Sequence, residues 1–392
     1  MNILIDIGHP AHVHVTKHFA HEMEKRGHQV LFTCRQKEFI IQLLEDEGFC
    51  YVSFGKKYTT TLKKLWGLVK FDYKMWRTSL KFKPDMFVSL GSMYAAQVSW
   101  LIRKPHVSFE DTYNMEQVRL YRPFTDLILA GDYEHPQLSQ TKEFRMAGYN
   151  ELAYLHPNRF TPDESVLKEL GVEKGGKYVV VRFVAWNASH DLGHQGISLE
   201  NKMKAVREFS KLGRVFISSE SELPKEFDDY RLPTHPNRIH DVIAFASLVF
   251  GESSTMSEEA AMLGVPSIYL NNDSTYYTKH LENDYQLMYN LTESEQDQVK
   301  AIQLGVDLLS KDDNEQNWKN KSNAMLREKI DVSSFLTWIV DNWPESKEII
   351  MKNPDYQYRF SMPSAKAVPL TGGGVFYNKQ HNPADNRQGM TD

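Results

Sequence analysis

The 392-residue chain has few cysteines, no long hydrophobic run and no excess of basic residues. Its two cysteines, Cys34 and Cys50, are too few for a disulfide framework and favour a reducing compartment. No stretch approaches the roughly 18 consecutive apolar residues of a transmembrane helix, and the N-terminus lacks the basic start of a secretion signal. A net charge of -5 gives no reason to expect a nucleic-acid partner. We therefore expect a cytoplasmic protein.

The first part of the chain alternates short apolar runs with amphipathic stretches. The apolar fraction of 41% and the charged fraction of 25% are typical of a soluble globular protein, and the length suits two α/β domains. Buried parallel strands give short apolar runs, whereas surface helices repeat every three to four residues. The pattern predicts strands at 3–7, 29–33, 86–89, 106–109 and 127–130, and helices at 13–26, 37–47, 94–103 and 115–121.

The same alternation restarts after a polar, proline-containing stretch at 156–162. It predicts strands at 178–183, 214–218, 248–250 and 267–270, helices at 202–211, 241–246 and 256–263, and a mainly helical segment from 292 to 343. We therefore predict an α/β fold of two Rossmann-like domains whose parallel sheets face a central cleft, with a helical C-terminal segment. The predicted parts are an N-terminal domain (1–155), a linker (156–176), a C-terminal domain (177–343) and a disordered tail (361–392).

Three histidines, His9, His12 and His14, follow Gly8 at the end of the first predicted strand. Ligands of open parallel sheets bind at the carboxyl ends of strands, often over a helix N-terminus, and Gly8 allows a tight turn there. A histidine at that point could deprotonate an acceptor hydroxyl, because its pKa lies near neutrality. The alternative is that the histidines only cap the helix; their spacing suits zinc poorly. We take His12 as the best catalytic candidate.

A second turn, at 251–257, joins a predicted strand to a helix through small hydroxyl residues. The amides and hydroxyls of Ser253, Ser254 and Thr255 could hold a diphosphate at the helix start. Glu258 and Glu259 follow, and a carboxylate there could accept both hydroxyls of a ribose. The alternative is that the serines cap the helix and the glutamates offset its dipole.

Polar residues also follow the first strands of the second half. Arg182 could pair with phosphate, while His190 and Asp191 could form an acid/base pair; Glu220 ends the next strand and could contact the donor. Ordinary surface contacts are the alternative. The segment 56–83 has nine Lys or Arg against one acid, Asp72, with apolar residues at helical spacing. It could meet anionic lipid at the inner membrane face, or it could be a core helix with a basic solvated side.

The second turn resembles the donor-nucleotide loop of GT-B glycosyltransferases and of UDP-N-acetylglucosamine 2-epimerases. The chain keeps Ser253, the pair Glu258-Glu259, Ala260 and the later Leu-Gly-x-Pro run at 263–266. By this resemblance Glu259 is the ribose ligand, Ser253 to Thr255 are the phosphate cradle, and His240 is similar to a histidine of the epimerase donor site. Ser254 and Thr255 stand where the epimerases have glycines, which changes the freedom of the loop backbone.

The first turn resembles that of the N-acetylglucosaminyltransferase that completes lipid II, and His12 falls on that family's histidine. The segment 107–111 is similar to a strand end of the epimerases, which implies that Glu110 or Asp111 lies in the cleft. The whole pattern over about residues 1–340 resembles an uncharacterised bacterial family related to both groups of enzymes. Its shared runs are 6–14, 148–157, 182–191 and 218–220.

These features together predict a glycosyltransferase that takes a nucleotide sugar, with UDP as the expected nucleotide, and needs no cofactor or metal. The acceptor would be a glycan or a lipid-linked molecule. The reaction would then belong to cell-envelope polysaccharide synthesis. Two other functions stay open: epimerisation or hydrolysis of a UDP-amino sugar, and nucleotide-sugar binding without catalysis. Transfer is preferred over epimerisation because the chain lacks the His-Arg-Arg-Glu-Asn stretch of the epimerases.

Overall fold

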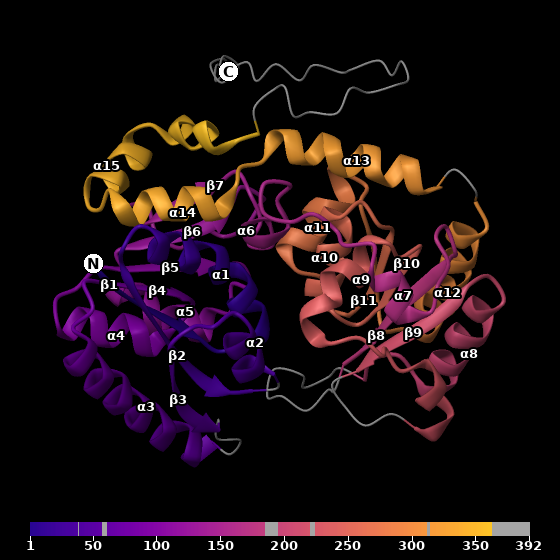
Figure 1. The fold of residues 1–392 in the computed structure, drawn as a ribbon, viewed down its shortest axis with the longest axis horizontal. Helices are drawn as coiled ribbons and strands as arrows, with labels where there is room; N and C mark the ends of the chain where they lie inside the picture. Colours follow the sequence, from indigo (N-terminus) through magenta and orange to yellow (C-terminus); the bar gives the residue numbers. More distant parts are fainter. Residues whose placement is uncertain (38, 57–60, 185–194, 220–223, 312–313, 363–392) are drawn as a thin grey trace, which may run out of the picture.

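A computed structural model describes residues 1–37, 39–56, 61–184, 195–219, 224–311 and 314–362. The chain forms two halves side by side, each built on a parallel sheet with helices on both faces (Figure 1). The predicted fold class is therefore confirmed. No helix of the described part is long and apolar enough to cross a membrane.

The first sheet has seven parallel strands in the order β3-β2-β1-β4-β5-β6-β7. Its central strands are continuous apolar runs because helices cover both faces; Ile3, Ile5 and Ile7 of β1 are fully buried. The strands are β1 Asn2–Ile7, β2 Gln29–Gln36, β3 Tyr51–Lys56, β4 Met86–Leu90, β5 His106–Glu110, β6 Leu127–Gly131 and β7 Glu143–Met146. The helices of this half are α1 Pro10–Lys25, α2 Ile40–Asp46, α3 Thr61–Phe82, α4 Met93–Leu101 and α5 Met115–Tyr121.

The second sheet has five parallel strands in the order β12-β11-β10-β8-β9. They are β8 Tyr178–Phe183, β9 Arg214–Ser219, β10 Leu248–Gly251, β11 Ser267–Leu270 and β12 Tyr289–Leu291. The helices around it are α7 Val166–Leu170, α8 Leu199–Ser210, α9 Ile239–Ala244, α10 Ser254–Met262, α11 Tyr276–Asn283, α12 Glu295–Leu309 and α13 Asn314–Glu328. Helix α7, which falls inside the predicted linker, packs against α9 and belongs to the core of this half.

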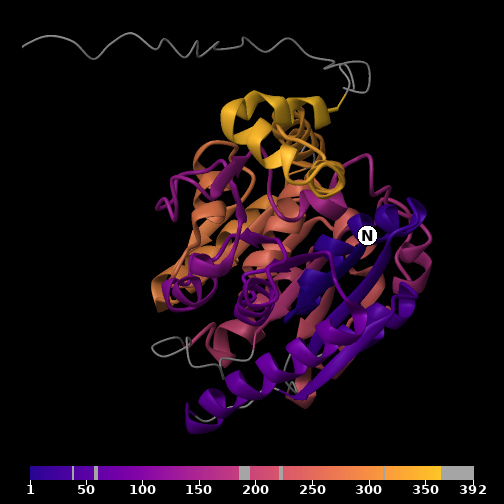
Figure 2. The same ribbon diagram turned by 90° about the vertical axis from the view of Figure 1, so that its left-hand side faces the viewer.

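The C-terminal helices cross back to the first half (Figures 1 and 2). Helix α14, Val332–Asp341, packs against α1 and against the short helix α6, Leu152–Leu155, and is followed by α15, Glu345–Lys352. Asp331 caps α14 through Ser334 N and accepts two hydrogen bonds from Arg159 Nε, at 2.9 and 3.1 Å. The range 177–343 therefore contains helices that lie on both halves. Most of the predicted tail, 363–392, lies outside the described residues, while Ser361 pairs with Ile330.

Candidate functional site

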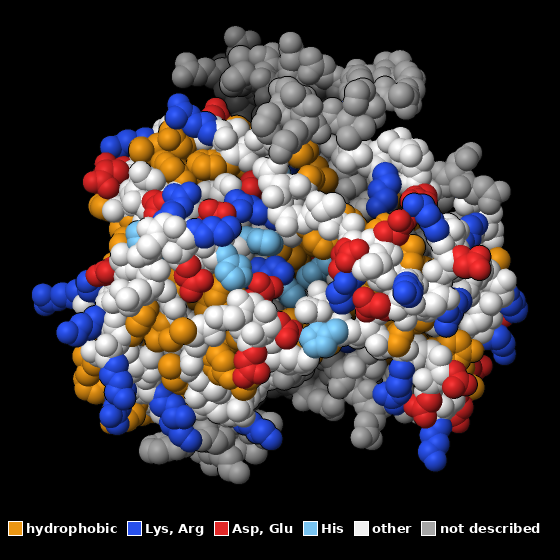
Figure 3. Space-filling view, in the orientation of Figure 1, with side chains coloured by type: hydrophobic (Ala, Val, Ile, Leu, Met, Phe, Trp, Pro, Cys, Tyr) orange, Lys and Arg blue, Asp and Glu red, His pale blue; other side chains and the backbone are white. Residues whose placement is uncertain are grey.

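The two turns singled out in the sequence face one cavity of about 740 Å³ between the halves. The first half contributes the start of α1 and the segment after β2; the second contributes the carboxyl ends of β8, β9 and β10 and the start of α10. Both sheets reverse their strand order here, between β1 and β4 and between β8 and β10, and open α/β sheets bind ligands at such points. Histidine side chains gather around this hollow in the centre of Figure 3.

The first turn places its histidines differently from one another. His9 caps α1, since its Nδ1 accepts from Ala11 N at 3.2 Å, and it lines the cavity. His12 Nδ1 accepts from Gly8 N at 3.3 Å, which folds the ring over the turn, and His12 is not among the described residues lining the cavity. His14 does line it, and its buried Nδ1 has no hydrogen-bond partner in the described part of the chain. Burial, with His240 beside it, lowers the pKa of His14 well below its ordinary value.

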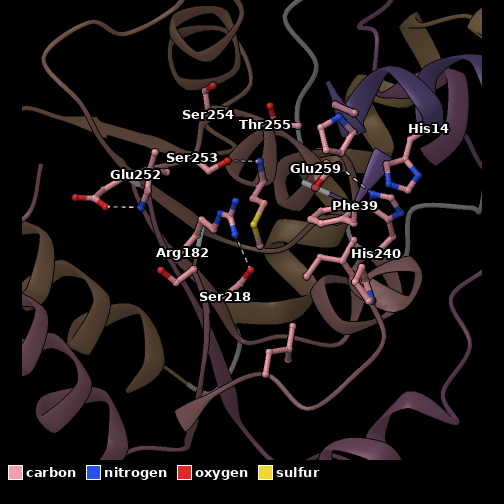
Figure 4. Close-up of a pocket in the computed structure, with 18 of the residues that line it drawn as sticks. His14, Phe39, Arg182, Ser218, His240, Glu252, Ser253, Ser254, Thr255 and Glu259 are labelled. Carbon is pink, nitrogen blue, oxygen red and sulfur yellow. Dashed lines mark hydrogen bonds and ion pairs between the residues drawn. The ribbon is translucent and has the colours of Figure 1, made fainter. Parts of the chain in front are cut away.

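The second turn forms because Gly251 lets β10 pass close to β8. Its φ is +151°, and a Cβ there would lie 2.1 Å from the Arg182 carbonyl oxygen. Ser253 then caps α10, accepting from Met256 N at 3.3 Å. Ser253, Ser254 and Thr255 all line the cavity at the helix start, where unpaired amides favour an anion (Figure 4).

Glu259 and Glu252 are two buried carboxylates that line the cavity, and Glu259 is the one on α10. Its Oε1 accepts from Tyr154 OH at 2.7 Å and lies 3.0 Å from His240 Nε2. The His14 and His240 rings meet edge to face with centroids 4.7 Å apart (Figure 4). Side chains from α1, α6, α9 and α10 therefore converge on one point, which joins the two halves through a polar network.

Glu258 points away from the cavity toward the start of α6. It shares a hydrogen bond with the buried Glu151, and burial is the largest cause that raises the pKa of both carboxyls, that of Glu151 to about 8. Glu151 further raises the pKa of Glu258, whereas the hydrogen bond from Glu258 lowers the pKa of Glu151 and so offsets part of the effect of burial there. The adjacent glutamates thus have different surroundings.

Arg182 lies at the end of β8 and lines the cavity, with its Nη1 donating to Ser218 Oγ at 2.9 Å. Glu252 lies beside it, and its carboxylate accepts from Val184 N at 2.8 Å and from Ile197 N at 2.6 Å. Glu252 therefore joins two described residues that are thirteen positions apart in the sequence. The predicted site residues His190, Asp191 and Glu220 lie outside the described residues.

Glu110 and Asp111 lie at the end of β5, away from the residues that line the cavity. Glu110 Oε1 accepts from Asp111 N, Thr112 Oγ1 and Tyr113 N, while its Oε2 accepts from Tyr121 OH, so this carboxylate organises its own loop. Burial and the neighbouring Glu110 raise the pKa of Asp111 to about 6. Asp111 accepts from Asn150 Nδ2 at 2.7 Å.

Several cavity residues did not stand out in the sequence. Lys37 and Phe39 come from the segment after β2, and Arg231, Thr234 and His235 come from the segment after β9. The rule that ligands lie beyond the carboxyl ends of strands could have found Lys37 and Phe39, because they follow a predicted strand. Arg231, Thr234 and His235 follow β9 by more than ten residues, and no pattern in the surrounding sequence predicts that they line the cavity.

The family model described as Protein of unknown function (DUF354) matches residues 1–329. The chain belongs to this family. An uncharacterised protein of Methanocaldococcus jannaschii is 22% identical to the chain over 279 residues, which cover 68% of this chain and 81% of the relative.

Solved structures with the same fold include two kinds of enzyme. The UDP-GlcNAc 2-epimerase of Neisseria meningitidis, bound to UDP-GlcNAc, has a TM-score of 0.59 at 14% identity, over 87% of this chain and all of that chain. MnaA of S. aureus, in a co-structure with UDP, has a TM-score of 0.63 at 12% identity, over 88% and 97%. The glycosyltransferase VinC in complex with DTDP has a TM-score of 0.57 at 12% identity, over 89% and 100%. At these identities the likeness shows the fold.

Proposed function

We propose that the protein is a glycosyltransferase that takes a sugar from a nucleoside diphosphate sugar, with UDP as the nucleotide. The observation that carries this proposal is the cavity between the halves, which joins a helix N-terminus, an arginine and a buried carboxylate. An epimerase bound to UDP-GlcNAc, MnaA in a co-structure with UDP and a glycosyltransferase in complex with DTDP share the fold and support the choice of ligand.

Different parts of the cavity would bind different parts of the donor. The start of α10, with Ser253 to Thr255, and Arg182 would hold the diphosphate and stabilise its charge as it leaves, a role that a metal ion plays elsewhere. Glu259 would accept ribose hydroxyls through Oε2, because Tyr154 and His240 both engage Oε1. The polar network would fix the orientation of that carboxylate before the donor arrives.

The acceptor would approach from the first half, where the histidines of α1 lie. An imidazole there would take the proton of the attacking hydroxyl; His12 stays the predicted base, and His14 joins it as a candidate because it lines the cavity and its buried Nδ1 has no hydrogen-bond partner among the described residues. Glu110, Asp111, His190 and Asp191 stay predicted catalytic groups. The acceptor class remains a glycan or a lipid-linked molecule.

Epimerisation of a UDP-amino sugar is the second candidate. Asp111 is not among the described residues that line the cavity, so this candidate rests on the resemblance of 107–111 to an epimerase strand end and on the UDP-GlcNAc 2-epimerase that shares the fold. Deuterium appearing at sugar C2 in heavy water, without an acceptor, would identify this reaction. Transfer instead predicts release of UDP that depends on an acceptor.

A thermal-unfolding series with UDP, UDP-sugars, dTDP and GDP tests donor binding. UDP at about 100 times its Kd should stabilise the protein by about 2.7 kcal/mol and raise Tm. Glu259→Gln should abolish most of that increase, whereas Glu208→Gln on the outer face of α8 should leave it unchanged. No Tm increase with any of these nucleotides would overturn the proposal, and binding without turnover over many acceptors would indicate a binding protein.

A further inference from the structure

We propose that the outer face of the first half is a docking surface for an anionic lipid membrane. This surface, called here the α3–α4 surface, consists of α3, the end of α4 and the turn at Phe124. It lies outside the cavity and does not depend on the proposed function. Figure 2 shows α3 running along the outside of the first half.

The α3–α4 surface exposes large apolar side chains that no other part of the described chain covers. Along α3, Val69, Tyr73 and Leu80 are between 52% and 59% exposed, although the opposite side of the helix buries Phe71 and Met75 in the core. Trp100 and Leu101, at the end of α4, are 62% and 59% exposed. Helix α3 is therefore apolar on two sides, and a helix that only covered a core would need one apolar side.

The middle of α3 and the end of α4 share one hollow. A hollow of about 530 Å³ is lined by Tyr73 and Trp76 of α3 together with Trp100, Leu101 and Phe124. The Trp100 and Phe124 rings meet edge to face, with centroids 5.4 Å apart. Contiguous apolar patches on a protein surface mark interaction sites, whereas single exposed apolar residues are ordinary.

Basic side chains border the apolar surface. Arg77 and Lys81 are exposed on α3, within one turn of Tyr73 and Leu80. Beyond the ridge of Trp100 and Phe124, a second hollow of about 720 Å³ is lined by Arg103, Lys104 and Lys142. In Figure 3 the lower left edge of the molecule carries basic side chains in blue beside apolar ones in orange.

The acidic residues of this face add little negative charge. Asp72 is the one acid of α3, and burial together with Asp6 raises its pKa to about 7. Asp85 is paired with Lys104 at 3.3 Å, and Asp126, which lines the second hollow, accepts from His106 N at 2.9 Å. These two carboxylates are outnumbered by Arg103, Lys104 and Lys142 around that hollow. The side chains around the apolar part of the α3–α4 surface therefore carry a net positive charge, although the whole chain has a net charge of -5.

Exposed tryptophan and tyrosine among Lys and Arg match the interface of a bilayer. Aromatic rings settle at the level of the lipid headgroups, and basic side chains attract anionic lipid. A second copy of the chain fits less well, because two copies of a basic surface would repel each other. Helix α3 starts next to the carboxyl end of β3, at the side of the sheet that faces the cleft. A membrane along α3 would therefore bring an acceptor held in lipid toward the cavity.

Co-sedimentation of the full chain with vesicles tests the proposal. Vesicles of phosphatidylcholine with roughly one quarter phosphatidylglycerol should pull down the protein, and pure phosphatidylcholine should not. Binding should fall between about 0.1 M and about 0.5 M salt, because screening weakens attraction at the surface. Arg77→Gln with Lys81→Gln should lower the partition coefficient about fivefold for each charge removed. Trp100→Ser with Leu101→Ser should lower it by about tenfold or more.

A matched control changes exposed apolar residues elsewhere. Leu199→Ser with Met203→Ser on α8 removes side chains of similar exposure from the second half and should leave vesicle binding unchanged. The UDP-dependent rise in Tm should also be unchanged in every variant, which separates failure of this proposal from failure of the proposed function. Absence of binding to anionic vesicles, or equal loss in the α8 variant, would overturn the proposal. The proposal would also be overturned if analytical ultracentrifugation showed that the protein is a dimer and that Trp100→Ser dissociates this dimer.

Discussion

At the scale of single residues, the direction in which a side chain leaves its helix decides its role. Consecutive helix residues point about 100° apart, so Glu258 and Glu259 cannot face the same partner. Glu259 enters the cavity and meets Tyr154 and His240, while Glu258 meets Glu151. The same rotation separates His12, over its own turn, from His14 in the cavity wall.

The sequence could place these groups at the site without choosing among them. It marked the three histidines and the two glutamates, because each group follows a predicted strand. The choice within each group depends on where the other half of the molecule lies, and no pattern along the chain contains that information. Glu151 was part of a noted run, but its partner Glu258 is more than a hundred residues away.

The Glu151 and Glu258 pair makes stability depend on pH. The pKa of Glu151 rises from 4.5 to about 8 on folding, so the unfolded chain loses this proton first and stability falls as pH rises across that range. Glu151→Gln removes the titration, and we expect it to be about as stable as the wild type near about pH 5 and more stable near about pH 9. Tm measured against pH checks this.

The same substitution at the exposed Glu164 is the control for Glu151→Gln. It should give a curve of Tm against pH parallel to that of the wild type. If the Glu151→Gln curve is also parallel, the carboxyl pair does not titrate as described.

At the scale of secondary-structure elements, prediction succeeded at the centres of the sheets and at the edge strand β9, and failed at the other three edges. The strands missed in the sequence are β3, β7 and β12, and each is an edge strand. An edge strand is partly in contact with water, so it need not be a continuous apolar run; β7 is Glu-Phe-Arg-Met. Central strands such as β1 are buried on both faces, and all of them were predicted with ends within three residues of those observed.

The turn between β10 and α10 depends on the absence of a side chain at Gly251. Gly251→Ala would place a Cβ 2.1 Å from the Arg182 carbonyl oxygen, so β8 and β10 would have to separate. We expect a loss of about 3 kcal/mol in the free energy of unfolding, measured with urea. UDP binding should weaken as well, because the start of α10 moves.

Gly175→Ala is the control for backbone conformation alone. Gly175 has a φ of +81° but nothing within 4 Å of the added Cβ, so it should cost about 1 kcal/mol. Equal losses for the two variants would show that the close approach to Arg182 does not matter.

At the scale of the whole molecule, the two halves are joined by more than the linker. Helix α6 contacts α1, α10 and α14, and α14 follows the second half in the sequence but covers the first. The sequence predicted a helical C-terminal segment without its location, because an amphipathic helix shows that it has a partner but not which one.

We expect the halves to unfold in one transition. Phe335 of α14 is fully buried and packs against Phe144 of the first half, with ring centroids 5.6 Å apart. Phe335→Ala should cost about 3–5 kcal/mol. Calorimetry should show a single peak moved to lower temperature. Two peaks, of which only one moves, would show that the halves are independent.

The return of α14 also bears on how the protein is made. A ribosome delivers α1 some three hundred residues before the helix that covers it. Until then, the parts of α1 and α6 that α14 covers in the folded protein lack that cover. The core of the first half can therefore close only after α14 has been made and has left the ribosome, so this half completes its folding late in synthesis.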